Sequence, residues 1–150
     1  MGRIAAILIS MAVFTTGTFA HSTTTHNKET ARRVFLEIFN EGKYDVANEI
    51  YASDFVNHTV TRDVGLAEDQ AAMRGWRAAA PDLVMTVDRE IAEGEYVTVL
   101  WSGIGTNTGN GNGFHATGQR MTMRGITIWR IVGGKIREEW SHFSQPTVVP

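Results

Sequence analysis

The C-terminal third of the chain carries the pattern that most limits how this sequence can fold. Two alternating segments, 125–132 and 135–143, are joined by Gly133-Gly134. Gly-Gly is a favoured two-residue hairpin turn because both positions tolerate positive φ angles. Since side chains alternate along a strand, one face of the second segment carries Ile136, Glu138, Trp140 and His142. We expect this face to be buried, which would require the carboxylate and the imidazole to find partners or to line a pocket.

Helical spacing dominates the first half of the chain. Apolar residues over 27–42 recur at intervals of three and four, which predicts an amphipathic helix. Asp45 is a suitable N-cap for a second short helix over 45–51. A third helix is expected over 66–80, because Pro81 cannot continue it.

The pattern changes to strands after the third helix. We expect strands over 83–91, 96–104 and 120–132. The first should have one solvent-exposed face, and the second should be covered on both faces. The glycine-rich segment 105–113 is predicted to be a mobile loop and a candidate lid. The sequence therefore predicts an α+β domain, with three helices covering one face of a curved, antiparallel-rich sheet that forms a cone-shaped barrel around an internal pocket.

The N-terminus has the layout of a secretory signal. Residues 1–20 contain Arg3, an apolar run and small residues before a cut after Ala20. We expect an exported chain, periplasmic or secreted, that begins at His21, with a polar leader over 21–26, a domain over 27–145 and a tail over 146–150. The apolar run is short for a membrane span, so no membrane association is expected after cleavage.

Composition excludes several kinds of chemistry. The formal net charge is −2 and no block of like charge occurs, which argues against nucleic acid as a partner. There is no cysteine, so disulfides and thiolate catalysis are absent. Glu138 and His142 share a strand face but would lie about 13 Å apart, too far for one metal ion, and no metal site is predicted.

Five short motifs, in order and spacing, resemble the SnoaL-like polyketide cyclase (ester cyclase) family of the nuclear-transport-factor-2-like superfamily of α+β barrels. They are Asp54-Phe-Val-Asn-His58, Pro81-Asp82-Leu83, Gly105-Thr-Asn-Thr-Gly109, Thr117-Gly118-Gln-Arg120 and Gly134-Lys-Ile-Arg-Glu-Glu-Trp140. The resemblance covers about 28–145. It implies a pocket for a small apolar, often carbonyl-bearing molecule, without metal or organic cofactor, and a homodimer, because this superfamily often pairs through the exposed face of its sheet.

Characterised cyclases of the family close a ring by an aldol reaction, in which a carboxylate removes a proton alpha to a carbonyl and a histidine assists. This chain departs from that pattern at two places. Asn107 stands where the loop motif of the family has histidine, and no carboxylate occurs near Met121 or Met123, where the aspartate of the family aligns. The catalytic candidates must therefore come from elsewhere in the chain.

Three residues are candidates for catalysis. Glu138 is the candidate base, and the alternative is a buried ion pair with Arg124. The resemblance implies that His58 faces the pocket, while the alternative is a hydrogen-bonded histidine in a connection between a helix and a strand. His115 follows the glycine-rich loop and is a candidate substitute for the missing loop histidine, unless it is simply solvated.

Five further residues are candidates for substrate binding: Trp76, Asn107, Arg124, Trp140 and His142. The two tryptophans could instead be ordinary residues of the hydrophobic core, and His142 could be solvent-exposed near the end of its strand. Three function classes stay open: a cofactor-free cyclase, isomerase or lyase, a non-catalytic binder of a small apolar ligand, and a dimerising interaction module. A catalytic pocket needs a carboxylate with a raised pKa within reach of the ligand.

Overall fold

The computed structural model describes residues 17–149, so most of the predicted signal segment lies outside the described residues. Its helical elements are α1 (Gly17–Arg33), the π-helix η1 (Val34–Asn40), α2 (Val46–Ile50) and α3 (Leu66–Ala79). Its strands are β1 (Tyr51–His58), β2 (Asp63–Gly65), β3 (Val84–Glu93), β4 (Tyr96–Thr106), β5 (Arg120–Val132), β6 (Lys135–Phe143) and β7 (Thr147–Val148). The predicted α+β class is confirmed.

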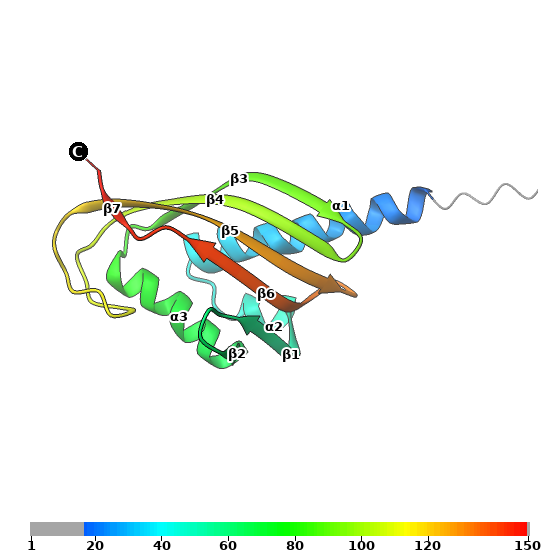
Figure 1. Ribbon diagram of the computed structural model, residues 1–150, viewed down its shortest axis with the longest axis horizontal. Coiled ribbons are helices and arrows are strands. Elements are labelled where there is room, and N and C mark those ends of the chain that lie inside the picture. The colour runs from blue at the N-terminus through cyan, green and yellow to red at the C-terminus, as the bar shows by residue number, and fades with distance from the viewer. Residues whose placement is uncertain (1–16, 150) are drawn as a thin grey trace, which may run out of the picture.

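The strands form one curved sheet with the helices packed on its concave side (Figure 1). The strand order is β2-β1-β6-β5-β4-β3, and β7 pairs with β5. All pairs are antiparallel except β1 with β6. The sheet is not closed into a complete barrel. The segment expected as a tail, 146–150, supplies the short strand β7.

The first helical segment is longer than its sequence pattern predicts. It begins at Gly17 rather than at Asn27, so the expected polar leader over 21–26 is helical. Asn27 is buried, and its Nδ2 donates to the carbonyl oxygens of Gly94 at 3.4 Å and Ile131 at 3.5 Å. The segment ends at Gly42, whose φ of +69° lets the chain turn away.

The core lies between this helical segment and the concave face of the sheet. Its largest fully buried side chains include Trp129, Ile131, Ile136 and Ile38. Strand β4 buries its inward residues, whereas its outward residues are only partly covered and Tyr96 is 48% exposed. The prediction that this strand is covered on both sides is therefore wrong for the outer face.

A β-bulge in β6 changes which residues of that strand face inward. Ile131 pairs with Ile136, but the preceding residue Arg130 pairs with Glu138, so β6 contains one extra residue at Arg137. Beyond the bulge the inward residue is Glu139, which pairs with Trp129. The predicted face was wrong from this point on, because alternation restarts after an inserted residue. Glu138, Trp140 and His142 lie on the outer face.

The glycine-rich loop packs against α3. The Gly109 N–H donates to the Ala79 carbonyl at 3.0 Å, and Asn112 Nδ2 donates to the Ala72 carbonyl at 2.9 Å. Gly111 approaches the helix so closely that a Cβ atom there would lie 2.0 Å from the Gly75 carbonyl oxygen. The loop is thus docked on α3 rather than extended into solvent.

Candidate functional site

A cavity of about 490 Å³ lies between the helices and the concave face of the sheet. Six of its lining residues are aromatic: Phe35, Phe39, Trp76, Trp101, Trp129 and Phe143. Val60, in the turn between β1 and β2, lines the cavity and is 86% exposed. Phe143, at the end of β6, also lines it and is 47% exposed. These two residues mark the side on which the cavity opens, and its volume suits a small organic molecule.

Two buried carboxylates line this cavity. Asp69 comes from the first turn of α3 and is 7% exposed, and Glu139 comes from β6 and is 8% exposed. The amide of Asn57 joins them, since Nδ2 lies 2.8 Å from Asp69 Oδ1 and 3.4 Å from Glu139 Oε1. We refer to Asp69 and Glu139 as the acid pair.

Glu139 also receives hydrogen bonds from its own sheet. Trp129 Nε1 donates to Oε2 at 2.7 Å, and Ser141 Oγ donates to Oε1 at 2.8 Å. Thr127 Oγ1 lies 2.8 Å from Ser141 Oγ and accepts the indole N–H of Trp101 at 3.0 Å. An indole nitrogen can only donate, so this chain of hydrogen bonds runs from Trp101 toward the carboxylate. The donors orient Glu139 and partly offset the cost of burying its charge.

The surroundings of the acid pair favour the protonated state. Burial raises the pKa of Glu139 to about 8, with a further contribution from the charge of Asp69, against the hydrogen bonds from Trp129 and Ser141. Burial likewise raises the pKa of Asp69, against the hydrogen bond from Asn57. Because two neighbouring buried carboxylates resist ionising together, the pair retains a proton near neutral pH. An acid and a base are then available at one place.

One atom of the acid pair, Asp69 Oδ2, is buried and has no hydrogen-bond partner. The buried hydroxyl of Tyr51 also has none. The pKa of Tyr51 is raised well above its usual value by burial and by the negative charges of Glu139 and Asp69. Tyr51 therefore belongs to the same electrostatic environment as the pair.

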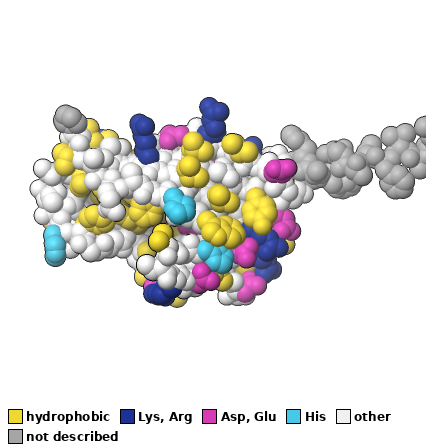
Figure 2. Space-filling view, in the orientation of Figure 1, with side chains coloured by type: hydrophobic (Ala, Val, Ile, Leu, Met, Phe, Trp, Pro, Cys, Tyr) yellow, Lys and Arg dark blue, Asp and Glu magenta, His cyan; other side chains and the backbone are white. Residues whose placement is uncertain are grey.

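The structure places the predicted base and histidine together, but outside the cavity. Glu138 is half-buried on the outer face, and Arg130 Nη1, rather than Arg124, donates to it at 3.3 Å. His58 Nε2 lies 4.0 Å from Glu138 Oε1, and its ring stacks on Trp140 with centroids 4.7 Å apart. Figure 2 shows this face, with hydrophobic and histidine side chains exposed over the sheet. None of these residues lines the cavity.

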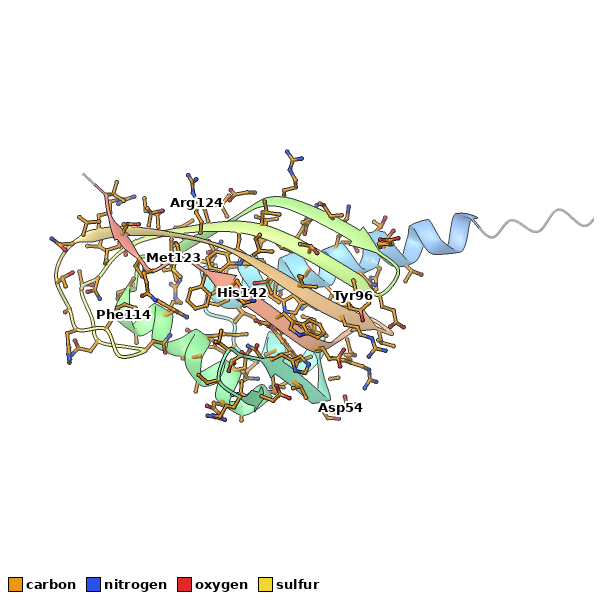
Figure 3. All side chains as sticks on the ribbon, in the orientation of Figure 1. Asp54, Tyr96, Phe114, Met123, Arg124 and His142 are labelled. Atoms are coloured by element: carbon orange, nitrogen blue, oxygen red, sulfur yellow. The ribbon has the colours of Figure 1, made fainter. Side chains whose placement is uncertain are left out.

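The other predicted residues divide between the cavity and the surface. Trp76 lines the cavity and packs between Phe114 and Phe143, with centroid distances of 5.4 and 5.9 Å. His115 is exposed in the loop. Arg124 and His142 are exposed on β5 and β6, and Figure 3 shows both at the outer side of the sheet.

Asn107 is buried and holds the glycine-rich loop in place. Its Nδ2 donates to the carbonyl oxygens of Ala79 at 3.1 Å and Gly109 at 3.0 Å, and its Oδ1 accepts from the Thr117 N–H at 3.0 Å. Since every polar atom of the side chain is engaged within the loop and with α3, the observed contacts of Asn107 are structural.

The acid pair was missed for two different reasons. The bulge at Arg137 hides the inward direction of Glu139, because strict alternation points it outward. Asp69 could have been found, since it shares a helical stripe with Leu66, Met73 and Trp76 at spacings of three and four. An acid on an otherwise apolar stripe is a signal for a buried carboxylate.

Within residues 17–149, no three histidine, aspartate or glutamate side chains come together in an arrangement that could hold a metal ion. The helices in this part of the chain also lack the combined length and apolar character needed to span a membrane.

The fold and its cavity define an α+β pocket protein of the cone-shaped, nuclear-transport-factor-2-like kind. Residues 29–149 match the model of the SnoaL-like polyketide cyclase family, and the chain belongs to this family. No match was found among curated proteins.

Solved structures share the fold. AclR from Streptomyces galilaeus, a proposed hydroxylase, is 24% identical with a TM-score of 0.74 over 81% of this chain and 76% of AclR. A proposed SnoaL-like polyketide cyclase from Jannaschia sp. CCS1 has the same identity and TM-score, over 81% of this chain and 87% of its own. IdmH from Streptomyces antibioticus, a proposed polyketide cyclase, is 22% identical with a TM-score of 0.69 over 79% of this chain and 91% of its own.

Proposed function

We propose that this protein is a cofactor-independent cyclase or isomerase that acts on a small apolar carbonyl compound, with the acid pair as its catalytic groups. The observation that carries the proposal is the presence of two buried carboxylates, joined by Asn57, in an aromatic cavity. The family assignment supports a small-molecule pocket with this kind of chemistry.

The acid pair can supply both proton transfers that such a reaction needs. The ionised member accepts a proton from the carbon alpha to the carbonyl, and the protonated member donates to the oxygen on which charge develops. The electron pair of the broken C–H bond then forms the enol double bond, ready for ring closure or for reprotonation at another position. Because one pair holds base and acid together, no cofactor is required by this scheme.

The test compares two neighbouring residues that face opposite sides of β6. Exchange of the alpha protons of α-tetralone with deuterated buffer is followed by NMR for the wild type, Glu139→Gln and Glu138→Gln. We expect Glu139→Gln to lower the enzyme-dependent exchange rate about a hundredfold or more, the usual range for a lost general base. Glu138→Gln should stay within about twofold, because its side chain lies outside the cavity. Equal losses in both variants, or exchange unaffected by Glu139→Gln, would contradict the assignment.

We also propose that the outer face of the sheet forms a homodimer. The face carries exposed apolar residues, namely Ile91, Tyr96, Ile126 and Ile128. Exposed apolar residues gathered on one face of a folded domain favour association. Ile126→Lys should convert the dimer to monomer in sedimentation velocity, while Val60→Lys, at the exposed turn beside the cavity, should leave it unchanged. A wild type that sediments as a monomer at high concentration would overturn this proposal.

Export is proposed from the signal-like segment 1–20. Among the residues from 23 onward, whose burial is described, Asn27 is the first buried one, so cleavage after Ala20 would leave its contacts with Gly94 and Ile131 intact. We expect the full-length chain to yield an extracytoplasmic product that begins at His21, measured by intact mass. A product recovered only in the cytoplasm with Met1 retained would contradict export.

A further inference from the structure

The charges that line the cavity are not balanced. Four of the lining residues are ionisable: Arg62, Glu68, Asp69 and Glu139. Arg62 forms an ion pair with Glu68, and both side chains are more than half exposed. The acid pair, in contrast, forms no ion pair with any of the described residues that line the cavity. A buried negative charge without a cation raises the free energy of the ligand-free site.

Asp69 adds a second and independent observation. The residue is 7% exposed and lines the cavity, yet its Oδ2 atom accepts no hydrogen bond. Its Oδ1 atom accepts a single hydrogen bond, from Asn57. Buried carboxylate oxygens normally accept hydrogen bonds or contact a cation. Asp69 Oδ2 therefore lacks a hydrogen-bond donor or a cation as its partner.

The walls of the cavity suit a cation that is attached to an apolar ring. Three tryptophans, Trp76, Trp101 and Trp129, contribute to the lining. The faces of aromatic rings carry negative potential and attract ammonium groups, most strongly in the case of tryptophan. Aromatic walls together with desolvated carboxylates form a combination that recognises organic ammonium ions.

We propose that the cavity selects apolar ring compounds that carry a protonated amine over the matched alcohol, and rejects the matched carboxylate. The inference deepens the proposed function, because it rests on the same cavity and acid pair and narrows the substrates to carbonyl compounds with a basic amine. An anionic ligand is excluded because it would lie against like charge without a free cation to compensate.

Binding of the ammonium ion is coupled to proton release. A cation in the cavity favours the ionised form of both carboxylates, so the proton that the pair shares passes to solvent. The groups around the pair are Tyr51 of β1, which stays protonated, and the Arg62–Glu68 ion pair at the β1–β2 turn and α3. The affinity for the amine therefore rises with pH until the acid pair is ionised in the ligand-free protein, and falls once the amine itself loses its proton.

The experiment uses calorimetric titration of the full chain with naphthylmethylamine, naphthylmethanol and naphthoate at about pH 6 and about pH 8. We expect the amine to bind roughly tenfold tighter than the alcohol at the higher pH, and the naphthoate roughly tenfold weaker. Amine binding should release protons, seen as a dependence of the heat on the ionisation enthalpy of the buffer. The alcohol should show no such dependence.

Variants separate this selectivity from general effects on the fold. Glu139→Gln should bring the affinities for amine and alcohol within about twofold, whereas Glu138→Gln, on the outer face, should keep the wild-type preference. Asp69→Asn supplies the same test if Glu139→Gln does not fold. Equal binding of amine and alcohol at both pH values, or a preference that survives in both cavity variants, would overturn the inference.

Failure of the ligand selectivity can be distinguished from failure of the proposed catalytic function. Selective amine binding without alpha-proton exchange would contradict the catalytic proposal and leave the ligand selectivity supported. Exchange of the alpha protons of α-tetralone without preferential binding of the amine would support the catalytic proposal and contradict the ligand selectivity.

Discussion

Trp129 Nε1 lies 2.7 Å from Glu139 Oε2, and the two residues are direct cross-strand neighbours on the inner face of the β5–β6 pair. The indole is 2% exposed and the carboxyl-bearing residue 8% exposed, so the contact is shielded from water. A buried acceptor that faces a donor-only group keeps one orientation, because loss of this hydrogen bond would leave both groups unsatisfied. With Oε2 held by Trp129, the other carboxylate oxygen of Glu139, Oε1, faces Asn57 and Ser141. The contact with Trp129 thereby sets the geometry of the acid pair.

Stability should fall as pH rises from about 5 to about 8. The pKa of Glu139 is raised from 4.5 to about 8 in the folded state, so the folded protein binds more protons than the unfolded chain in this window. The stabilisation is complete below the unfolded pKa and is lost as pH rises through the folded pKa. We expect a decrease on the order of 3 kcal/mol in the free energy of unfolding, measured by urea denaturation at several pH values.

Glu139→Gln should reduce this slope, because a neutral amide does not titrate and only the raised pKa of Asp69 then contributes with the same sign. Glu138→Gln should preserve the full slope. Glu37 and Asp82 have lowered pKa values, owing to a hydrogen bond from Arg33 and to hydrogen bonds from Thr106, respectively. Their stabilisation is lost only as pH falls below about 4.5, outside the window in question. A slope of unchanged size in Glu139→Gln would show that Glu139 is not the cause of the pH dependence.

Asp69→Asn should lower the pKa of Glu139. The negative charge of Asp69 is the second cause of the upward shift after burial, and asparagine removes this charge while it keeps the shape of the side chain. The pKa is measured from the carboxyl carbon shift of Glu139 in an NMR titration. Asp54→Asn is the matched control, since Asp54 forms a surface ion pair with Arg137 and should leave the titration of Glu139 unchanged. An unchanged pKa in Asp69→Asn would show that the two acids are not coupled.

Asn107→Ala should destabilise the protein by about 2–3 kcal/mol in urea unfolding. The substitution leaves the carbonyls of Ala79 and Gly109 and the N–H of Thr117 without their side-chain partner, in a largely buried place. Asn110→Ala is the control, because Asn110 accepts one exposed hydrogen bond from the Ala116 N–H. Its cost should stay below about 1 kcal/mol. Similar costs for both variants would contradict a structural role specific to Asn107.

Gly111→Ala should detach the glycine-rich loop from α3. A Cβ atom would lie 2.0 Å from the Gly75 carbonyl oxygen, and backbone cannot give way by that much. We expect faster amide hydrogen exchange at Gly109, whose N–H bonds to Ala79. Gly113→Ala is the control, since Gly113 has open space around it and a φ of +79°. Its strain should cost only about 1 kcal/mol. Undisturbed exchange at Gly109 in Gly111→Ala would contradict the docked loop.

Much of the fold follows from local pattern. The turn at Gly133-Gly134 has the positive φ angles, +59° and +74°, that its sequence predicts. The fifth strand has the predicted bounds, Arg120 to Val132, and the third helix ends one residue before its predicted end. These features depend on interactions between residues close in sequence, which spacing and turn chemistry describe well.

The site was harder to predict because it depends on register. Trp76 lines the cavity, in agreement with its prediction as a pocket residue. Strict alternation predicts Glu138 in the pocket and the resemblance predicts His58 there, and neither residue lines the cavity. Because of the bulge at Arg137, the carboxylate that faces the cavity is Glu139 rather than Glu138. The position of such a bulge depends on how β6 pairs with β5 and with β1, and spacing along a single strand does not reveal it.

The amino-acid sequence by itself determined the α+β class, the order of the helices and strands, the hairpin at Gly133-Gly134 and the family. Spacing of two or of three to four residues sets these features through short-range geometry. Only the tertiary structure decided that Glu139 rather than Glu138 faces the cavity, and that Asp69 lies beside it through Asn57. Asp69 and Glu139 are seventy positions apart, and their shared desolvation arises only when α3 packs over the sheet.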